Sequence, residues 1–107
     1  MFVEDAILRV IARRTLRNFW ESSPAYADTI TPLTEWYRHM EKADYRTPQE
    51  IKAELRSASI LKNCRVVFNI AGNKYRVVLA IDYERQIAYV RFVGTHAQYD
   101  NINPESI

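Results

Sequence analysis

The residues best suited to chemistry lie near a Gly72-Asn73 pair in the second half of the chain. If this pair forms a two-residue turn between strands, Arg76 lies opposite Asn69, with Lys74 one step nearer the turn. A guanidinium fixed on a sheet offers a planar pair of donors to phosphate oxygens and does not lose its charge. The pattern therefore predicts an anion site. The alternative is that these side chains only keep a surface strand soluble.

A second candidate group is the segment 94–99, Gly-Thr-His-Ala-Gln-Tyr, which follows the last predicted strand. Histidine titrates near neutral pH, so His96 can exchange a proton with a substrate. Tyr99 could orient a substrate through its hydroxyl or stack on a base through its ring. The alternative is that both side chains pack against the sheet and have only a structural role.

Other reactive side chains form no recognisable site. His39 follows Glu35 by four residues, which is typical of a pair on a helix surface. Cys64 is the only cysteine, so an internal disulfide is excluded. One cysteine and two histidines are too few soft ligands for a structural zinc site without carboxylates. We therefore expect neither a metal nor a cofactor.

Positive charge is concentrated in the part of the chain that carries both candidate groups. The whole sequence has a net charge of +2. Residues 1–58 balance nine basic against nine acidic side chains, whereas residues 62–96 hold six basic and two acidic side chains. A basic zone confined to one part of a small protein indicates a polyanionic ligand or an acidic partner. A solvated sheet face would give the same count.

The elements that must position these residues follow from the periodicity of the sequence. The segment Ile7–Ile11 is short and β-branched and predicts a first strand. Helical spacing then predicts a short helix that ends near Ser22. A second helix begins at an N-cap Thr31 with Pro32 in its first turn. A third begins at Thr47 with a capping box and runs for about ten residues.

After residue 59 the period changes from helical to two, which predicts an antiparallel hairpin. The expected register sets Ile70 opposite Tyr75 and Val67 opposite Val78. It places the large apolar side chains on one face and the polar ones on the other. The polar set is Arg65, Asn69, Lys74 and Arg76.

A further strand over Ile87–Val93 completes the order of strand, helices and antiparallel meander, and the tail from residue 97 has no period. The order predicts an α+β fold in which an N-terminal strand and two or three helices pack on one face of a twisted antiparallel sheet. The opposite face is left for a ligand.

The length of 107 residues predicts one domain, residues 1–107, with a single core. Hydrophobic residues make up 48% of the chain, which excludes wholesale disorder. No run approaches 18 apolar residues, and Glu4 and Asp5 stand where a signal peptide would be basic. We therefore expect no membrane span and no secretion, and a cytoplasmic location.

Several stretches resemble the HigB toxins, the "host inhibition of growth" family within the RelE/ParE superfamily. They are the strand segments 65–81 and 89–100 and the shorter segments 13–20, 35–37 and 43–48. The resemblance covers roughly residues 9–107, and the first eight residues look like an extension relative to many members. It implies a RelE-like fold with two or three helices against a twisted antiparallel sheet, in agreement with the periodicity.

The resemblance also implies a function. Such proteins are toxins of type II toxin–antitoxin systems that enter the A site of the 70S ribosome and cut messenger RNA. The implied partners are the ribosome, the messenger RNA and a HigA-like helix-turn-helix antitoxin from the same operon. Operator DNA would be contacted only through the antitoxin.

The resemblance extends to individual residues. Nucleases of the superfamily commonly use an arginine in a Tyr-Arg-Val context, which Arg76 matches, and some use a histidine in a Gly-Thr-His stretch, which His96 matches. The match at Tyr99 is looser, because the aromatic residue there varies among relatives. The acidic base of some relatives has no clear match in this chain, so the general base is left unassigned.

These residues suit metal-free RNA cleavage, in which the substrate's own 2′-hydroxyl attacks the adjacent phosphorus. Arg76, with Lys74, would stabilise the developing charge, and His96 would protonate the leaving 5′-oxygen. Tyr99 or Tyr75 would stack on a base. The residues expected to hold RNA are Arg65, Asn69, Asn73 and Arg91.

Two other functions fit the same fold. A ParE-like gyrase poison would share the architecture without nuclease activity, but it would have no need of a proton donor such as His96. A catalytically silent module that binds RNA or a partner would bind tightly without cleavage.

Overall fold

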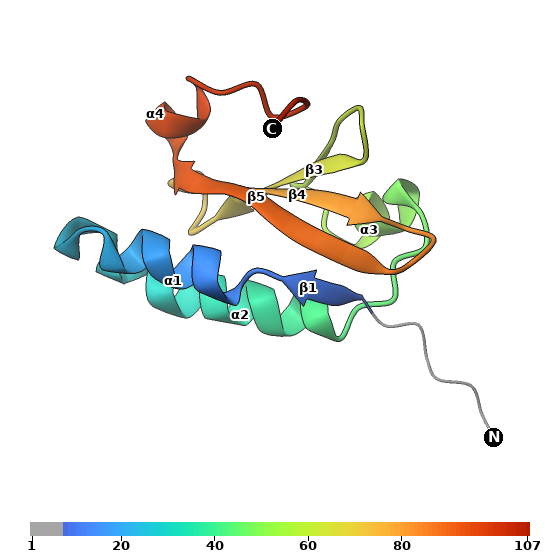
Figure 1. Cartoon of the computed structure of the whole chain (residues 1–107), viewed down its shortest axis with the longest axis horizontal. Coiled ribbons are helices and arrows are strands. Elements are labelled where there is room, and N and C mark those ends of the chain that lie inside the picture. Colours follow the sequence, from blue (N-terminus) through green and yellow to red (C-terminus); the bar gives the residue numbers. More distant parts are fainter. Residues whose placement is uncertain (1–7) are drawn as a thin grey trace.

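The computed structural model describes residues 8–107 and shows helices packed on a twisted sheet (Figure 1). The helices are α1 (Arg13–Glu21), the 3-10 helix η1 (Pro24–Thr29), α2 (Ile30–Glu41), α3 (Pro48–Glu54) and α4 (His96–Tyr99). The strands are β1 (Arg9–Ile11), β2 (Ser59–Ile60), β3 (Arg65–Ile70), β4 (Tyr75–Asp82) and β5 (Ile87–Thr95). The predicted α+β class is confirmed. The start of the predicted first strand, Ile7, lies outside the described residues.

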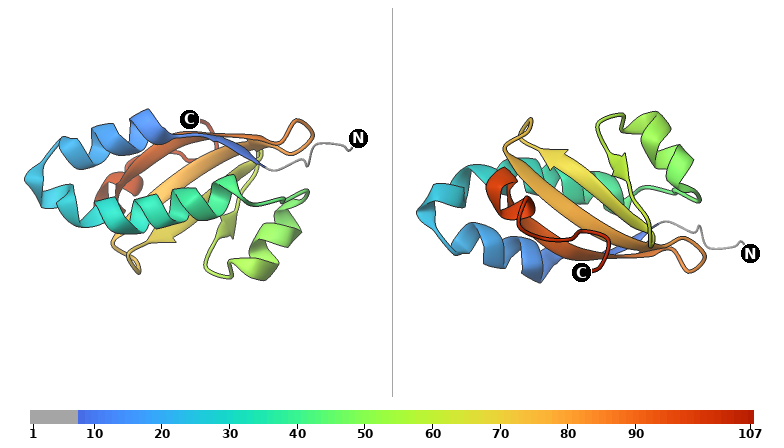
Figure 2. Two further views of the ribbon diagram at one scale, coloured as in Figure 1. Left: turned by 90° about the horizontal axis from the view of Figure 1, so that it is seen from below. Right: turned by 90° about the horizontal axis from the view of Figure 1, so that it is seen from above.

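The five strands follow the order β1-β5-β4-β3-β2. The predicted antiparallel pairing of β3 with β4 and of β4 with β5 is confirmed. The strand β2, which was not predicted, pairs antiparallel with β3, and β1 runs parallel to β5. The sheet is therefore mixed rather than wholly antiparallel. After β1 the chain crosses one face as α1 and α2, which lie side by side beneath the strands (Figure 2, left). Periodicity within a segment carries no information about which distant strand pairs with it, so the parallel edge could not be predicted.

The register of the β3–β4 hairpin agrees with the prediction. Ile70 pairs with Tyr75, and Val67 pairs with Val78. The turn differs in detail, because the positive φ angles lie at Ala71 (55°) and Gly72 (71°) rather than at the Gly72-Asn73 pair.

The helix starts are partly as predicted. At α3, the Thr47 hydroxyl oxygen accepts a hydrogen bond from the Glu50 amide at 3.2 Å, which confirms the N-cap. The Glu50 carboxylate accepts from the Arg46 amide instead of completing the capping box, and the helix has seven residues rather than about ten. The predicted N-cap at Thr31 is wrong, because η1 continues directly into α2 and places Thr31 inside the helix.

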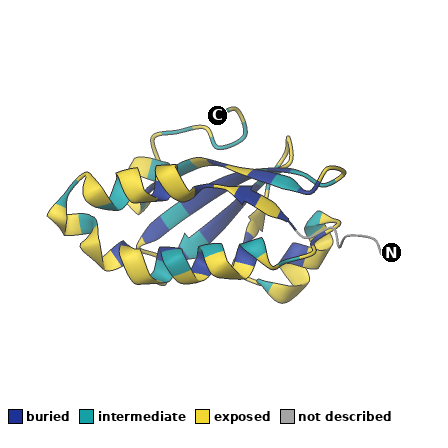
Figure 3. Cartoon of the chain, turned by 60° about the horizontal axis from the view of Figure 1, so that its bottom comes forward, coloured by how far each residue is buried: buried dark blue, intermediate teal, exposed yellow. Residues whose placement is uncertain are grey.

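The core lies between the sheet and the helices, where buried residues line the strands (Figure 3). Val66, Phe68, Val77 and Leu79 from the sheet belong to one apolar cluster with α2. The α2 residues in this cluster form one stripe at helical spacing: Leu33, Trp36 and Met40. Among the described residues, no helix has the length and hydropathy to span a membrane.

The face of the sheet opposite α1 and α2 is less open and less polar than predicted. Val67 and Val78 point to this face and are only 3% and 0% exposed. The chain after β5 forms α4 and then runs back over the sheet (Figure 1; Figure 2, right). The Arg65 guanidinium donates to the main-chain oxygen of Ile107, which holds this C-terminal segment in place.

Candidate active site

The candidate site lies at the end of the sheet where the β3–β4 turn meets α4. Arg76 pairs with Asn69 on β3, as predicted, and its Nη1 donates to the main-chain oxygen of Asn73 at 3.1 Å. Its guanidinium carbon lies 5.8 Å from the centre of the Tyr99 ring. This cation–π contact and the turn carbonyl together fix the direction of the guanidinium.

His96 is the first residue of α4, and its backbone amide donates to the main-chain oxygen of Lys74 at 3.2 Å. Its Nδ1 lies 3.2 Å from Oδ2 of Asp100, and the side chain is 54% exposed. A proton on Nδ1 directed at the carboxylate leaves Nε2 pointing to other partners. The His96 backbone amide and the Arg76 side chain therefore bond to neighbouring carbonyls of one turn, those of Lys74 and Asn73.

A capping box holds α4 in this position. The Thr95 hydroxyl accepts from the Gln98 amide at 3.1 Å, and the Gln98 side chain accepts from the Thr95 amide at 2.9 Å. Satisfying these end groups lets a four-residue helix persist beside the sheet. The cap therefore holds the start of α4, and with it the His96 backbone, beside β4.

Gly94 makes close packing possible beneath α4, because it lies opposite Arg76 on the adjacent strand. A Cβ atom at this position would lie 2.5 Å from Cζ of Phe92 and 2.7 Å from Oε1 of Gln98. The Phe92 ring is in turn 6.3 Å from the Tyr99 ring. Because Gly94 has no side chain, the Phe92 ring can pack over it. Phe92 then contacts Tyr99, and Tyr99 contacts the Arg76 guanidinium.

Lys74 is not placed as the sequence suggested. Its ammonium lies 2.5 Å from Oδ2 of Asp28 in η1, and the Tyr75 hydroxyl donates to Oδ1 of the same carboxylate at 2.7 Å. The hydrogen bonds from Lys74 and Tyr75 lower the pKa of Asp28. The hydrogen bond that Lys74 donates to Asp28 also raises the pKa of Lys74, while burial raises the pKa of Tyr75. The Lys74 charge is thus directed toward η1.

The remaining predicted residues divide between the two ends of the sheet. Asn69 and Asn73 lie at the turn beside Arg76. Arg91 is the extra residue of a β-bulge, since Val90 pairs with Leu79 and Phe92 with Val78. Its guanidinium carbon lies 5.7 Å from the Tyr89 ring centre. Arg91 and Arg65 line a separate shallow hollow of about 470 Å³ at the far end of the strands.

Sequence reasoning missed three residues that shape the site: Asp28, Phe92 and Asp100. The i, i+4 spacing of His96 and Asp100 could have revealed one pair if the tail had been predicted as helical. Asp28 is 46 residues from Lys74, and no local pattern links them. Within residues 8–107, no group of three or more His, Cys, Asp or Glu side chains is arranged to hold a metal ion.

The arrangement combines an anion-binding guanidinium, an exposed imidazole backed by a carboxylate, and aromatic rings. It can bind a phosphate group and exchange a proton beside it.

The model of a family described as HigB_toxin, "RelE-like toxic component of a toxin-antitoxin system", matches residues 29–102. The "mRNA interferase toxin HigB" of Escherichia coli (strain K12) is 30% identical over 95 residues, which is 87% of this chain and 88% of that protein. The "mRNA interferase HigB" of Shigella flexneri matches to the same extent. A protein of that name from Escherichia coli O6:H1 is 27% identical over 78% of this chain and 84% of its own length. The chain therefore belongs to the HigB family of RelE-like toxins, the toxic components of toxin–antitoxin systems.

Proposed function

We propose that this toxin is an endoribonuclease that cuts messenger RNA in the A site of the ribosome and thereby stops translation and growth in the cytoplasm. The observation that carries the proposal is that the Arg76 side chain and the His96 backbone amide bond to neighbouring carbonyls of one turn, so that both residues lie at the same end of the sheet. The names of the relatives, mRNA interferases, support the same substrate.

The proposed reaction needs no metal, since the nucleophile is the 2′-hydroxyl of the RNA itself. Its oxygen forms a bond to the adjacent phosphorus, and the bond from phosphorus to the 5′-oxygen breaks. The Arg76 guanidinium stabilises the charge that develops on the phosphate oxygens. In its protonated form His96 pairs through Nδ1 with Asp100 and donates the proton on Nε2 to the leaving 5′-oxygen, which leaves a neutral imidazole. The 2′-hydroxyl proton passes to a base for which we assign no residue.

The surrounding side chains bind the RNA in this proposal. Tyr99 is half-buried beside Phe92 and offers a ring on which a base can stack. Asn69 and Asn73 offer amide groups at the turn, and Arg91 extends the positive charge along β5. Lys74 contributes to the local potential while Asp28 holds its ammonium. Arg65 is already bound to the main-chain oxygen of Ile107, so its contribution to RNA binding requires displacement of the C-terminal segment.

Membership in the family gives the toxin an antitoxin partner. We propose that this partner is a HigA-like helix-turn-helix protein that also binds operator DNA, so that the toxin contacts DNA only through it. Gyrase poisoning is not favoured, because the matched relatives carry the name of mRNA interferases and a gyrase poison would not need the proton donor that we propose for His96. A silent binding module is disfavoured on the same ground.

The test is to add purified protein to translating ribosomes and map the ends of the messages. We expect His96→Ala and Arg76→Ala each to remain folded and to cleave at least about 100-fold more slowly, because each removes a group that acts on the transition state. Arg85→Ala is the matched control, because Arg85 is an exposed arginine in the β4–β5 loop. Cleavage by both variants at the wild-type rate, or intact transcripts on stalled ribosomes with the wild-type protein, would contradict the proposal.

A further inference from the structure

A second binding surface lies on the opposite side of the molecule from the candidate active site. The helices α1 and α2 run side by side (Figure 2, left). Residues of both helices line a groove of about 370 Å³. Its floor is apolar, because Leu16 is only 2% exposed and Trp20 and Tyr37 are half-buried. The rim carries three exposed arginines: Arg13, Arg17 and Arg38.

The structure of the chain alone does not account for these arginines. Between residues 8 and 107, none of the three takes part in an ion pair or a side-chain hydrogen bond, and Arg13 only lies over the Tyr37 ring at 5.8 Å. Glu41 is the one acidic residue lining the groove within this described range. In addition, α1 begins with Arg13 and Arg14 and has no acidic residue in its first turn. Positive charge at a helix N-terminus opposes the helix dipole, so folding does not favour this placement.

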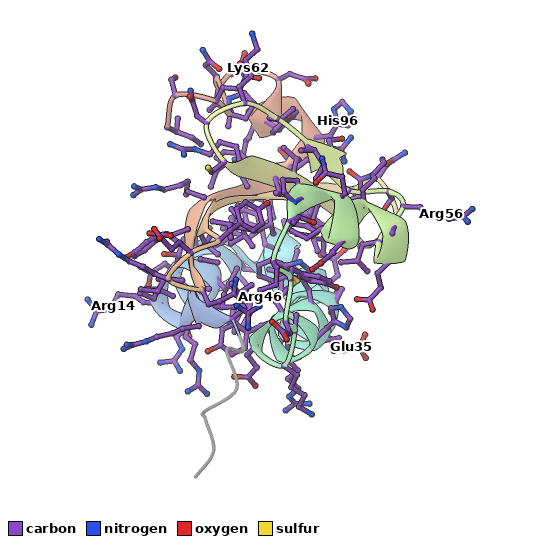
Figure 4. The ribbon with its side chains drawn as sticks, turned by 90° about the vertical axis from the view of Figure 1, so that its right-hand side faces the viewer. Arg14, Glu35, Arg46, Arg56, Lys62 and His96 are labelled. Carbon is purple, nitrogen blue, oxygen red and sulfur yellow. The ribbon has the colours of Figure 1, made fainter. Side chains whose placement is uncertain are left out.

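The groove and the candidate active site lie on different layers. The groove is lined by α1 and α2, which cover one face of the sheet, whereas α4 lies on the other face (Figures 1 and 2). Figure 4 shows the same separation, with Arg14 of α1 and His96 of α4 on opposite sides of the sheet. A partner in the groove therefore occupies a surface that is distinct from the one that carries Arg76.

We propose that this groove binds an amphipathic, acidic helix of the antitoxin. A groove between two helices accepts a third helix whose apolar side chains fill it and whose flanking residues meet the rim. Leu16, Trp20 and Tyr37 offer the floor for aliphatic side chains, and the arginines offer partners for Asp and Glu on the two flanks. An RNA backbone would pair with the arginines but would leave the apolar floor unfilled. The inference requires the antitoxin but not the cleavage chemistry, so it does not depend on the proposed reaction.

The test is a charge reversal on the rim, Arg17→Glu with Arg38→Glu, measured by calorimetric titration with the purified cognate antitoxin. We expect the affinity to fall at least 100-fold, because two attractive contacts become repulsive. Message cleavage without antitoxin should be unchanged, and in cells the antitoxin should no longer restore growth. The matched control is Arg14→Glu with Arg56→Glu, which makes the same charge change at exposed arginines outside the groove. It should bind the antitoxin like the wild type.

The neutral double variant Arg17→Gln with Arg38→Gln should bind the antitoxin with intermediate affinity. This variant controls for misfolding, because it removes the two charges without introducing new ones. Wild-type affinity in the charge-reversed variant would overturn the proposal. So would loss of cleavage on ribosomes with antitoxin binding retained, because that result would make the groove an RNA surface. A toxin that binds antitoxin through the groove but cleaves no RNA would refute the proposed reaction and leave this inference standing.

Discussion

The substitution Gly94→Ala in β5 should inactivate the candidate site, because the added methyl group would disturb the packing of α4 on this strand. In Gly94→Ala the new Cβ would meet Cζ of Phe92 at 2.5 Å and Oε1 of Gln98 at 2.7 Å, both far inside normal contact distance. Phe92 packs against Tyr99, and the Gln98 carbonyl accepts the Thr95 amide in the cap of α4. Neither group can move without disturbing its partner. The substitution therefore acts on the aromatic cluster and on the cap at once.

The size of the effect follows from these two contacts. Overpacking of this kind costs about 1–3 kcal/mol. Loss of the reciprocal cap adds about 1 kcal/mol, so the free energy of unfolding should fall by roughly 2–4 kcal/mol. For a domain of this size, 1 kcal/mol lowers Tm by roughly 4–8 °C, which predicts a decrease of at least about 8 °C. Because α4 positions His96, cleavage should fall by about 100-fold even at a temperature at which the variant is folded.

Thermal unfolding followed by circular dichroism and message cleavage on translating ribosomes measure the two effects separately. Gly72→Asn is the control, because Gly72 has φ of +71° and a Cβ added there would meet no heavy atom within 4 Å. Asparagine tolerates that backbone conformation, so stability and cleavage should change little. If Gly94→Ala keeps both the wild-type Tm and the wild-type cleavage rate, the tight packing that we describe beneath α4 does not exist.

Three further predictions concern stability. Hydrogen bonds from Lys74 and Tyr75 lower the pKa of Asp28 below 3.8, so the stabilisation from this carboxylate is present above that pH and is lost as the pH falls further. In urea unfolding, the free energy of unfolding of Asp28→Asn should therefore decrease less at acid pH than that of the wild type. An equal decrease in both proteins would refute this. Burial raises the pKa of Tyr83 from 10.0 to about 12, so the free energy of unfolding should fall as the pH rises through this interval. Alkaline denaturation should show a smaller decrease in stability for Tyr83→Phe than for the wild type. Thr47→Ala should cost about 1 kcal/mol in chemical denaturation, whereas Thr47→Ser should be close to neutral.

The sequence was informative wherever one short segment determines its own geometry. Alternation over 65–70 and 75–81 around a turn fixed the hairpin register, because a slip by one residue would bury charged side chains. The same register correctly placed Arg76 opposite Asn69. The cap at Thr47 was also predictable, since its hydroxyl bonds to a residue only three positions away.

Features that depend on distant segments could not be predicted in the same way. The Lys74 side chain points to Asp28 and not to the polar face of the hairpin. This contact forms only when η1, which carries Asp28, packs next to the β3–β4 turn. The helix α4 has only four residues, too few to show a helical period, so the contact between His96 and Asp100 was not predicted. The C-terminal segment covers part of a sheet face because Arg65 binds Ile107, 42 residues away.

The pairing of β1 with β5 has a consequence for how the toxin is made. The first strand finds its neighbour only after the last strand has left the ribosome, because Arg9 to Ile11 lie beside Ile87 to Tyr89. Chains emerge at roughly 5–20 residues per second, so several seconds separate the synthesis of the two strands. During that interval the nascent polypeptide lacks both a closed core and α4. The candidate active site, which α4 helps to form, is therefore completed only near the end of synthesis.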